Sequence, residues 1–447
     1  MVTGINKVKS RAFSVLILVF IAIIGMGFYV VRYAIFGAQW ASAPFNATVF
    51  RNAMLSVGVV SDRNGVVLAG ITDGKRTFAS NGEVRRATLH VVGDKDGNIG
   101  TGALTAFAPE LMGFNFITGS YSRSQTGRQI VLSIDSKLNA AAFRALDGRR
   151  GVVMVSNYET GEILCMVSSP AFDPGNPPDS FDSSALEGVF VNRAIQSVYP
   201  PGSTFKLVTA AAAIEKVPQV YDRKFNCTGS IEIGGDTLTC PREHGNVNFI
   251  RGLQVSCNIV FGELALDIGA DVLAEYTAKF ALSGRTSVSG IATAQGNFEK
   301  ATSGINVAWS GIGQFTNTVC PATMLRFVGA IANNGIAVEL DYLKRTGVSS
   351  VVPTSTERLL SRDTASLLGE IIELENNDSF PGLEVHAKSG TAQVGGGKDP
   401  HAWYVGYITN PNHPYAFVVI VENGGSGTSV AGPIASRVLQ EAISSWQ

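Results

Sequence analysis

The chain has 447 residues and a net charge of -1 at pH 7, so it lacks the basic excess typical of proteins that bind nucleic acid. This length allows two or three domains with a large core. Hydrophobic residues make up 45% of the chain and charged residues only 16%, a balance that one membrane-spanning segment helps to explain.

The N-terminal region contains such a segment, the uncharged stretch from Ala12 to Val31. Basic residues flank it on both sides: Lys7, Lys9, Arg11 and Arg32. A helix of this length crosses a bilayer core about 30 Å thick. By the positive-inside rule the N-terminus stays in the cytoplasm and the rest of the chain lies outside. We therefore expect residues 1–33 to form a short cytoplasmic tail and a transmembrane anchor.

A cleaved signal peptide is the alternative for this region. The small residues Ala41 to Ala43 before Pro44 favour cleavage. However, the apolar stretch is longer than the roughly 7 to 15 residues usual for a secretory signal. An uncleaved anchor is the better interpretation.

Residues 34–126 contain short apolar runs separated by Gly and Asn turns, such as LSVGVVSD at 55–62 and ATLHVVGD at 87–94. These runs predict β-strands in a small N-terminal module. A larger domain, residues 127–447, follows. Its opening sequence, RQIVLSIDSKLNAAAFRAL at 128–146, predicts a strand and then a helix.

Ser203 and Lys206 are three residues apart at the start of a predicted helix, STFKLVTAAAAIEK, which follows Pro200, Pro201 and Gly202. On a helix this spacing places both side chains on one face, so the amine can accept the hydroxyl proton during nucleophilic attack. The pair alone is weak evidence for catalysis, because about one or two such matches are expected by chance in a chain of this length. The alternative is an N-cap serine with a solvated helix lysine.

Four residues of a loop-rich stretch carry metal-binding side chains: Cys227, Cys240, His244 and Cys257. Three thiolates and one imidazole suit a tetrahedral structural zinc ion. A disulfide between Cys227 and Cys240 across the hairpin SIEIGGDTLT, or free thiols, are the alternatives. The remaining two cysteines, Cys165 and Cys320, lie in apolar surroundings and are expected to be buried.

Two further motifs follow Ser203 in a fixed order, Ser256-Cys257-Asn258 and Lys388-Ser389-Gly390-Thr391. Separately, the first reads as a polar helix start and the second as a Gly-containing strand that leads into the turn at Gly395 to Gly397. Together with Ser203 and Lys206, they supply the residue types that an active-serine acyl transferase needs. The ordered set predicts an active-serine acyl transferase.

The last segment, PIASRVLQEAISSW at 433–446, has apolar residues at helical spacing. These residues are Ile434, Val438, Leu439, Ala442 and Ile443. The helix is predicted to pack on a sheet.

On these motifs, and on NRAIQSVYPPGSTFKLVTAAAAIE, GVVMVSNYETGEILCMVSSPAFDP and HAWYVGYITNPNHPYAFVVIVENGG, the chain resembles class B penicillin-binding transpeptidases of cell-wall synthesis. The resemblance covers most of the chain. It implies an α+β fold: a single anchor, a small pedestal or dimerisation-like module, and a serine β-lactamase-like domain with a five-stranded antiparallel sheet flanked by helices. The N-terminal module is too short for the glycosyltransferase domain of class A members.

The resemblance also implies roles for the site residues. Ser203 is the acylated nucleophile, Lys206 its base, and Ser256 part of the proton relay. The backbone N–H groups of Ser203 and Thr391 form the oxyanion hole. Substrate contacts are implied for Asn258, Lys388, Ser389, Gly390 and Thr391. Ser389 replaces the threonine often found there, and it keeps a hydroxyl.

The implied activity is D,D-transpeptidation of peptidoglycan stem peptides through an acyl-serine, without a catalytic cofactor, with acylation by β-lactams. Alternatives are a D,D-carboxypeptidase, a membrane-anchored β-lactamase or a β-lactam sensor. The last is disfavoured because the sequence has a single anchor and no His-Glu-x-x-His motif. The family implies a membrane glycosyltransferase of the SEDS type as a partner.

Overall fold

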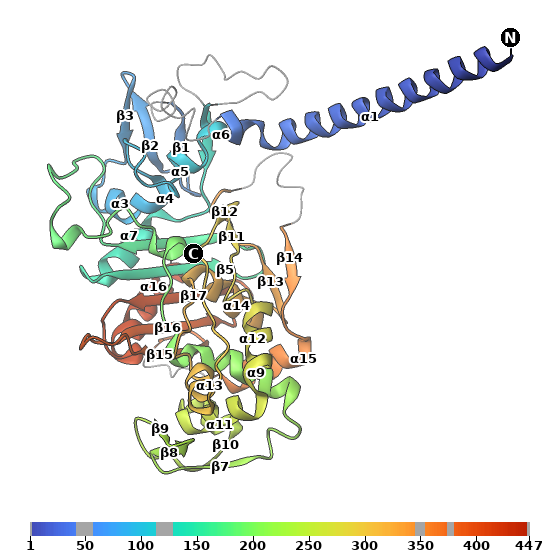
Figure 1. The fold of residues 1–447 in the computed structure, drawn as a ribbon. Helices are drawn as coiled ribbons and strands as arrows, with labels where there is room; N and C mark the ends of the chain where they lie inside the picture. Colours follow the sequence, from blue (N-terminus) through green and yellow to red (C-terminus); the bar gives the residue numbers. More distant parts are fainter. Residues whose placement is uncertain (1, 42–56, 113–127, 345–353, 373–379, 445–447) are drawn as a thin grey trace.

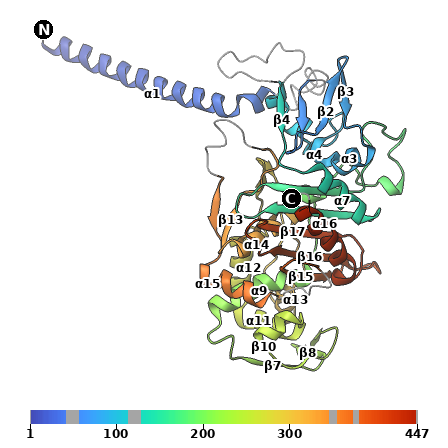
Figure 2. The same cartoon turned by 180° about the vertical axis from the view of Figure 1, so that it is seen from behind.

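The computed structural model describes residues 2–41, 57–112, 128–344, 354–372 and 380–444. Helix α1 (Val2–Ala41) extends away from the body of the molecule (Figures 1 and 2). Its segment Arg11–Tyr33 is long and apolar enough to cross a membrane, and no other such helix occurs in the described residues. The single predicted membrane helix is therefore confirmed. The signal-peptide motif begins at Ala41, the last residue of α1, and its remainder lies outside the described residues.

The N-terminal module contains a four-stranded sheet in the order β3-β2-β1-β4. Its strands are β1 (Val59–Ser61), β2 (Val67–Thr72), β3 (Lys75–Phe78) and β4 (Gln129–Val131). Strand β1, predicted from LSVGVVSD, pairs in parallel with β4. The strand that opens the predicted catalytic domain thus lies in the sheet of the N-terminal module.

The predicted strand at ATLHVVGD is wrong, because this run forms helix α4 (Leu89–Val92). All four of its residues are buried, so it does not alternate between buried and exposed positions as a half-buried strand would. A short apolar run of this kind suits a buried helical turn equally well. The other helices of the module are α3 (Gly82–Ala87), α5 (Ala103–Ala106) and α6 (Ala108–Met112).

The larger domain is built on a five-stranded antiparallel sheet in the order β15-β16-β17-β5-β6, as predicted. The strands are β5 (Gly151–Asn157), β6 (Ile163–Ser169), β15 (Val385–Ala392), β16 (His401–Ile408) and β17 (Tyr415–Val421). Every residue of β17 is buried, because helices cover both faces of the sheet. This explains the continuous apolar runs of the central strands.

Helices α7 (Ser136–Leu146) and α16 (Gly432–Ser444) cover one face. The side chain of Asp135 caps α7 by accepting the N–H groups of Lys137 and Leu138. The predicted C-terminal helix is confirmed: Ile434, Val438, Leu439 and Ala442 are buried, and Ile443 is partly buried.

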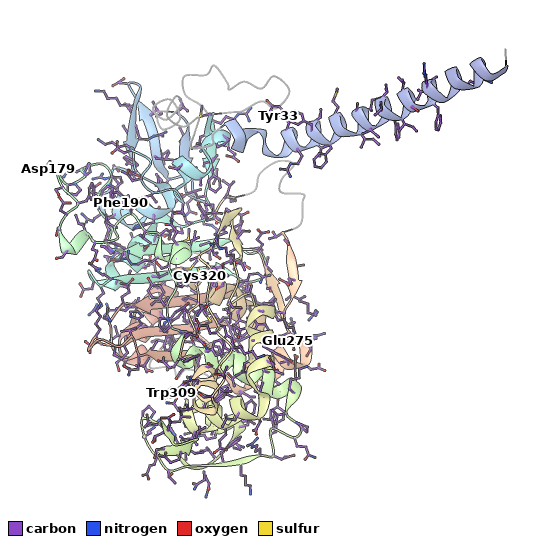
Figure 3. All side chains as sticks on the ribbon, in the orientation of Figure 1. Tyr33, Asp179, Phe190, Glu275, Trp309 and Cys320 are labelled. Atoms are coloured by element: carbon purple, nitrogen blue, oxygen red, sulfur yellow. The ribbon has the colours of Figure 1, made fainter. Side chains whose placement is uncertain are left out.

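The opposite face is covered by α8 (Arg193–Gln196) and α14 (Pro321–Ala332), and it continues into a helical lobe that carries the candidate site. Side chains fill the space between these elements (Figure 3). The lobe contains α9 (Lys206–Lys216), α10 (Phe249–Gln254), α11 (Asn258–Ile268), α12 (Ala270–Lys279), α13 (Gly304–Gly311) and α15 (Arg362–Ile371).

Short strand pairs surround the lobe. They are β7 (Lys224–Cys227) with β10 (Gly245–Asn248), β8 (Ser230–Ile233) with β9 (Asp236–Thr239), β11 (Ser287–Val288) with β12 (Ile291–Ala292), and β13 (Ile336–Val338) with β14 (Thr356–Arg358). The pair β8–β9 is the hairpin expected from SIEIGGDTLT.

Candidate active site

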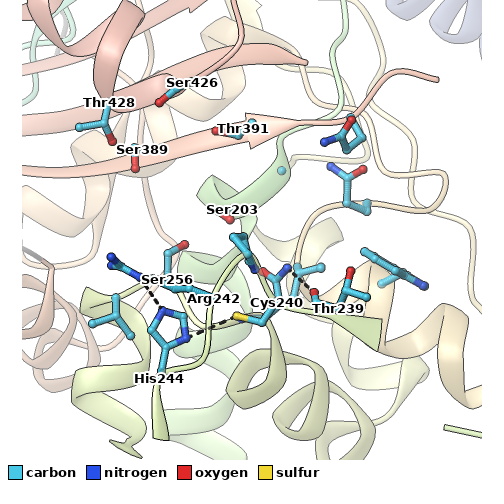
Figure 4. A pocket seen from close by; sticks show the side chains of 18 residues that line it. Ser203, Thr239, Cys240, Arg242, His244, Ser256, Ser389, Thr391, Ser426 and Thr428 are labelled. Carbon is cyan, nitrogen blue, oxygen red and sulfur yellow. Dashed lines mark hydrogen bonds between the residues drawn. The ribbon is translucent and has the colours of Figure 1, made fainter. Parts of the chain in front are cut away.

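The predicted site residues meet at a cleft of about 600 Å³ between the edge strand β15 and the helical lobe (Figure 4). Its lining comes from six segments: 202–203, 239–242 with 244, 255–258, 309–314, 389–393 and 426–428. No Asp or Glu side chain belongs to this lining. The cleft is therefore suited to a ligand that carries negative charge.

Ser203 lies in a 3-10 turn, Gly202–Phe205, that continues directly into α9. The predicted position at the start of the helix is confirmed, although the first turn is tighter than an α-helix. Gly202 has φ +53°, and a Cβ there would lie 2.9 Å from the carbonyl oxygen of Thr391. The N–H of Gly202 donates to Gly313 O at 2.9 Å. Only glycine fits both this conformation and this close approach to β15.

Lys206 is fully buried behind Ser203. Its Nζ donates to Asn258 Oδ1 at 2.7 Å and to Ser256 O at 2.6 Å, and it lies 3.2 Å from Ser256 Oγ, to which its lone pair is open when the amine is neutral. Burial, and secondarily the charge of Lys388, holds the pKa of Lys206 well below its ordinary value. The amine is thus suited to accept a proton at neutral pH.

Ser256 links the two lysines, because Lys388 Nζ donates to Ser256 Oγ, at 2.9 Å. The backbone of Ser256 has φ +54°, a conformation that non-glycine residues adopt at an energetic cost. Asn258 is the first residue of α11, and its Nδ2 donates to Thr239 O at 2.8 Å. One hydroxyl therefore stands between the two amines.

Strand β15 forms the opposite wall. Ser389 and Thr391 line the cleft and alternate with Lys388 and Gly390, which are buried. Gly390 allows close packing beneath the wall: a Cβ there would lie 2.9 Å from Thr204 Cγ2 and 3.0 Å from Pro201 O. The nucleophile turn and β15 are therefore fitted against each other without space for a larger side chain.

The four predicted metal-binding residues also come together, at the wall of the cleft that faces β15, which we call the lower wall. Their ligand atoms all lie within 4.8 Å of one another. Cys227 and Cys240 Sγ lie 3.5 Å and 3.4 Å from His244 Nδ1, and the sulfurs of Cys240 and Cys257 are 4.0 Å apart. The hydrogen bond with Cys257 holds the pKa of Cys240 below its ordinary value. No disulfide joins any of the five cysteines, and Cys165 and Cys320 are buried as predicted.

This cluster is directly connected to the cleft. Cys257 lies between Ser256 and Asn258 in the sequence, and the N–H of Asn258 donates to Cys240 Sγ at 3.3 Å. The cluster therefore holds the start of α11, where the relay hydroxyl and the amide are located.

Several lining residues were not predicted from the sequence: Arg242, Trp309, Gln314, Gln393, Ser426 and Thr428. Gln393 is the one with a usable signal, since it follows Thr391 by two residues along the predicted strand. Trp309 lies on α13 and Thr428 in the helical turn Gly427–Ala431, whereas the remaining three lie on loops. Their approach to the cleft depends on tertiary packing.

Comparisons with known proteins show which proteins the sequence and the fold resemble. The penicillin binding protein transpeptidase domain model matches residues 151–440. Peptidoglycan D,D-transpeptidase PbpA of Mycobacterium tuberculosis is 26% identical over 371 residues, covering 74% of this chain and 74% of that protein. Peptidoglycan D,D-transpeptidase MrdA of Escherichia coli is 26% identical over 370 residues, covering 71% of this chain and 58% of that protein.

Among solved structures, penicillin-binding protein A of M. tuberculosis in a ceftriaxone acyl-enzyme complex is similar, with a TM-score of 0.76 and 24% identity. The match covers 88% of this chain and 99% of that chain. The similarity therefore includes the N-terminal module as well as the sheet domain.

Proposed function

The chain belongs to the penicillin-binding protein transpeptidase family, and from this premise we propose that it is a peptidoglycan D,D-transpeptidase that acts through an acyl-serine. One observation carries the proposal: a buried Lys206 and Lys388 share the hydroxyl of Ser256 at a cleft that also exposes Ser203. This arrangement supplies a nucleophile, a neutral base and a relay for the leaving group.

In the first step, Ser203 Oγ attacks the carbonyl carbon between the two terminal D-alanines of a stem peptide. Its proton passes to the neutral Nζ of Lys206. When the tetrahedral intermediate collapses, the C–N bond breaks and the leaving amine takes a proton from Lys206 through Ser256 Oγ. D-alanine departs, and an ester joins Ser203 to the donor peptide.

Residues on both walls of the cleft bind the substrate in this proposal. Lys388, Ser389 and Thr391 hold the terminal carboxylate, and Asn258 contacts the donor amide. Gly390 contributes by letting β15 approach the nucleophile turn. The N–H groups of Ser203 and Thr391 form the oxyanion hole, where each donor contributes about 3 kcal/mol to transition-state stabilisation in comparable reactions.

In the second step, an amine of a neighbouring stem peptide attacks the ester and forms the cross-link. Water in place of that amine would give a D,D-carboxypeptidase. Incubation with a donor pentapeptide and an amine acceptor separates the two activities, since only transpeptidation produces the peptide-bonded product.

The decisive experiment is intact-mass analysis of the detergent-solubilised full chain after incubation with a penicillin. Wild type should carry one persistent adduct, and Ser203→Ala should carry none. No adduct with an intact drug would refute the acyl-serine mechanism. No adduct with the drug destroyed would identify a β-lactamase instead. A sensor would form the adduct but fail to cross-link any donor and acceptor.

We further propose a single-pass orientation with a cytoplasmic N-terminus and the catalytic domain outside, in the bacterial cell membrane. The basic residues before the apolar segment, including Lys9 and Arg11, support this orientation. Protease treatment of intact spheroplasts should cleave the catalytic domain and spare an N-terminal tag. Co-purification of a SEDS-type glycosyltransferase with the full chain would test the partner that the family implies.

A structural zinc ion at Cys227, Cys240, His244 and Cys257 is the second part of the proposal. A tetrahedral site with Zn–S near 2.3 Å and Zn–N near 2.0 Å requires separations of about 3.8 Å between sulfurs and about 3.6 Å from sulfur to nitrogen. Three of the six separations, 4.0 Å, 3.5 Å and 3.4 Å, fit these values, and all six are within 4.8 Å. Zinc there would stiffen the start of α11 and take no part in acyl transfer.

Metal analysis of protein purified under reducing, chelator-free conditions tests this site. One zinc per chain is expected in wild type and in Cys165→Ala, and much less in Cys240→Ala. Wild type without stoichiometric zinc would refute the metal site while leaving the acyl-serine mechanism intact.

A further inference from the structure

Three cysteine side chains meet beside the cleft, and one of them is open to it. Cys227 and Cys257 are buried, whereas Cys240 is 9% exposed and lines the cleft (Figure 4). A small oxidant that enters the cleft therefore reaches Cys240 first. Acylation of Ser203 uses none of these sulfurs, so their own chemistry is a separate property of the site.

The surroundings of Cys240 suit a reactive sulfur. Its Sγ accepts the N–H of Asn258, the first residue of α11, at 3.3 Å, and it lies 3.4 Å from His244 Nδ1. Polar groups on several sides of one sulfur, at the start of a helix, support the electron-rich form that reacts with peroxides.

Cys257 is the better placed of the two possible partners. Its Sγ contacts Cys240 Sγ at 4.0 Å, whereas Cys227 Sγ donates to Arg242 O at 3.7 Å. Since the sulfurs of a disulfide are about 2 Å apart, the pair must close by about 2 Å. Cys240 follows β9 on a loop, which is the kind of segment that can make such a movement.

We infer that the cluster is an oxidative modification site, at which hydrogen peroxide joins Cys240 and Cys257 in a disulfide. Cys240 Sγ attacks one peroxide oxygen, the O–O bond breaks, and a sulfenic acid and one water form. Cys257 Sγ then attacks the sulfenic sulfur. The hydroxyl leaves with the thiol proton as a second water, and the S–S bond forms. The two cysteines lose two electrons, which the peroxide takes up.

The disulfide also changes the acylation machinery, a consequence that rests on the proposed function. Cys257 lies between Ser256 and Asn258 in the sequence, and Asn258 Nδ2 donates to Thr239 O, beside Cys240, at 2.8 Å. Drawing the two sulfurs together therefore moves the relay hydroxyl and the amide. A misplacement of about 1 Å in an active site costs about 10²-fold in rate. Acylation should slow at least tenfold in the oxidised protein.

The modification and a metal ion exclude each other. Cys240 and Cys257 are two of the four residues that would hold zinc, and sulfurs bonded to each other cannot act as thiolate ligands. Preloading with zinc should therefore slow the reaction with peroxide. The inference itself concerns the metal-free chain and does not depend on the metal site.

The test uses the detergent-solubilised full chain, reduced, freed of metal by a chelator and treated with hydrogen peroxide. Alkylation under denaturing conditions, followed by mass spectrometry, counts the free thiols. The count should fall from five to three, because one disulfide removes two thiols. Proteolysis should release a peptide pair that links Cys240 to Cys257. A thiol reductant should restore all five thiols and the rate of acylation by penicillin.

Two variants sharpen this test. Cys240→Ala and Cys165→Ala each begin with four thiols, one fewer than the wild type. Cys240→Ala should keep all four under the same peroxide treatment, because the residue that reacts first is gone. Cys165→Ala is the matched control and should fall from four to two, since Cys165 is fully buried and lies outside the cluster.

A wild type that keeps five thiols would overturn the inference, as would thiol loss in Cys240→Ala or a link through Cys227. A Cys240–Cys257 disulfide with unchanged acylation would overturn its effect on the relay. A reduced wild type that forms no penicillin adduct would overturn the proposed function, and the thiol count and the linked peptides would still decide the modification site.

Discussion

The two walls of the cleft are stabilised in different ways. Strand β15 pairs with β16 at eight consecutive positions, from Val385 to Ala392, so backbone hydrogen bonds fix the upper wall. The lower wall is carried by β7–β10 and β8–β9, which pair at only four positions each. Side-chain contacts of Cys240, His244 and Cys257 hold it together. The upper wall should therefore be sensitive to added bulk, and the lower wall to the loss of particular side chains.

Between the walls, Lys206→Met should have the largest effect. Removing the base is expected to slow acylation by penicillin about 10²- to 10⁴-fold. The same change should shift the melting temperature at pH 7 only slightly, because methionine does not have to lose a proton but leaves Ser256 O and Asn258 Oδ1 without their donor. Stopped-flow acylation and thermal unfolding measure the two effects. Slow acylation with loss of a cooperative unfolding transition would indicate a misfolded cleft instead.

The pH dependence of stability gives a control for this variant. The pKa of Lys206 is lowered by burial, so between that value and the ordinary 10.5 the unfolded chain binds more protons at this residue than the folded chain does. The contribution of Lys206 to folding free energy therefore becomes more favourable as pH rises through this window. Lys206→Met should show a flatter dependence of stability on pH than wild type.

Gly390→Ala tests the upper wall. Its Cβ would lie 2.9 Å from Thr204 Cγ2, 3.0 Å from Pro201 O and 3.1 Å from Trp403 Cβ. We expect destabilisation of about 1 to 3 kcal/mol and acylation slowed at least tenfold, because the wall must move away from Ser203. Gly100→Ala is the control, since nothing lies within 4 Å of a Cβ at that position. Equal effects of the two substitutions would refute the tight fit at the nucleophile turn.

Cys257→Ala tests the lower wall against Cys165→Ala. Both cysteines are fully buried, so both substitutions should destabilise the protein, by about 1 to 3 kcal/mol. Only Cys257→Ala should slow acylation, by about tenfold, because only Cys257 lies beside Ser256 and in contact with Cys240. Acylation rates compared at equal folded fraction separate the two. A matching loss in both variants would mean that the cysteine cluster does not support the relay.

The sequence predicted some parts of the molecule correctly and others not, depending on whether a local pattern encodes the structure. The motif Lys388 to Thr391 lies on the eight-residue strand β15, and the loose alternation of HAKSGTAQ was enough to indicate a strand there. The short run at Leu89 to Val92 was misassigned, because burial on all sides removes the periodicity that separates helix from strand. Arg242 was missed because its position depends on contacts of Cys240 and His244 that no local pattern encodes.

Trp403→Phe should have the smallest effect, because it removes one contact between β16 and the nucleophile turn. Trp403 is fully buried, and its Nε1 donates to Pro200 O at 2.9 Å. Phenylalanine keeps most of the apolar packing but lacks the donor, which is worth about 0.5 to 1.5 kcal/mol. Acylation should slow about threefold to fivefold if this bond places Ser203, as a loss of about 0.7 to 1 kcal/mol implies.

Tyr199→Phe is the matched control, since it removes the hydroxyl that donates to Glu422 at 2.7 Å and leaves the bond to Pro200 in place. A larger rate effect in Tyr199→Phe would assign the placement of the turn to the Glu422 contact, and an unchanged rate in Trp403→Phe would leave it to the Gly202–Gly313 hydrogen bond.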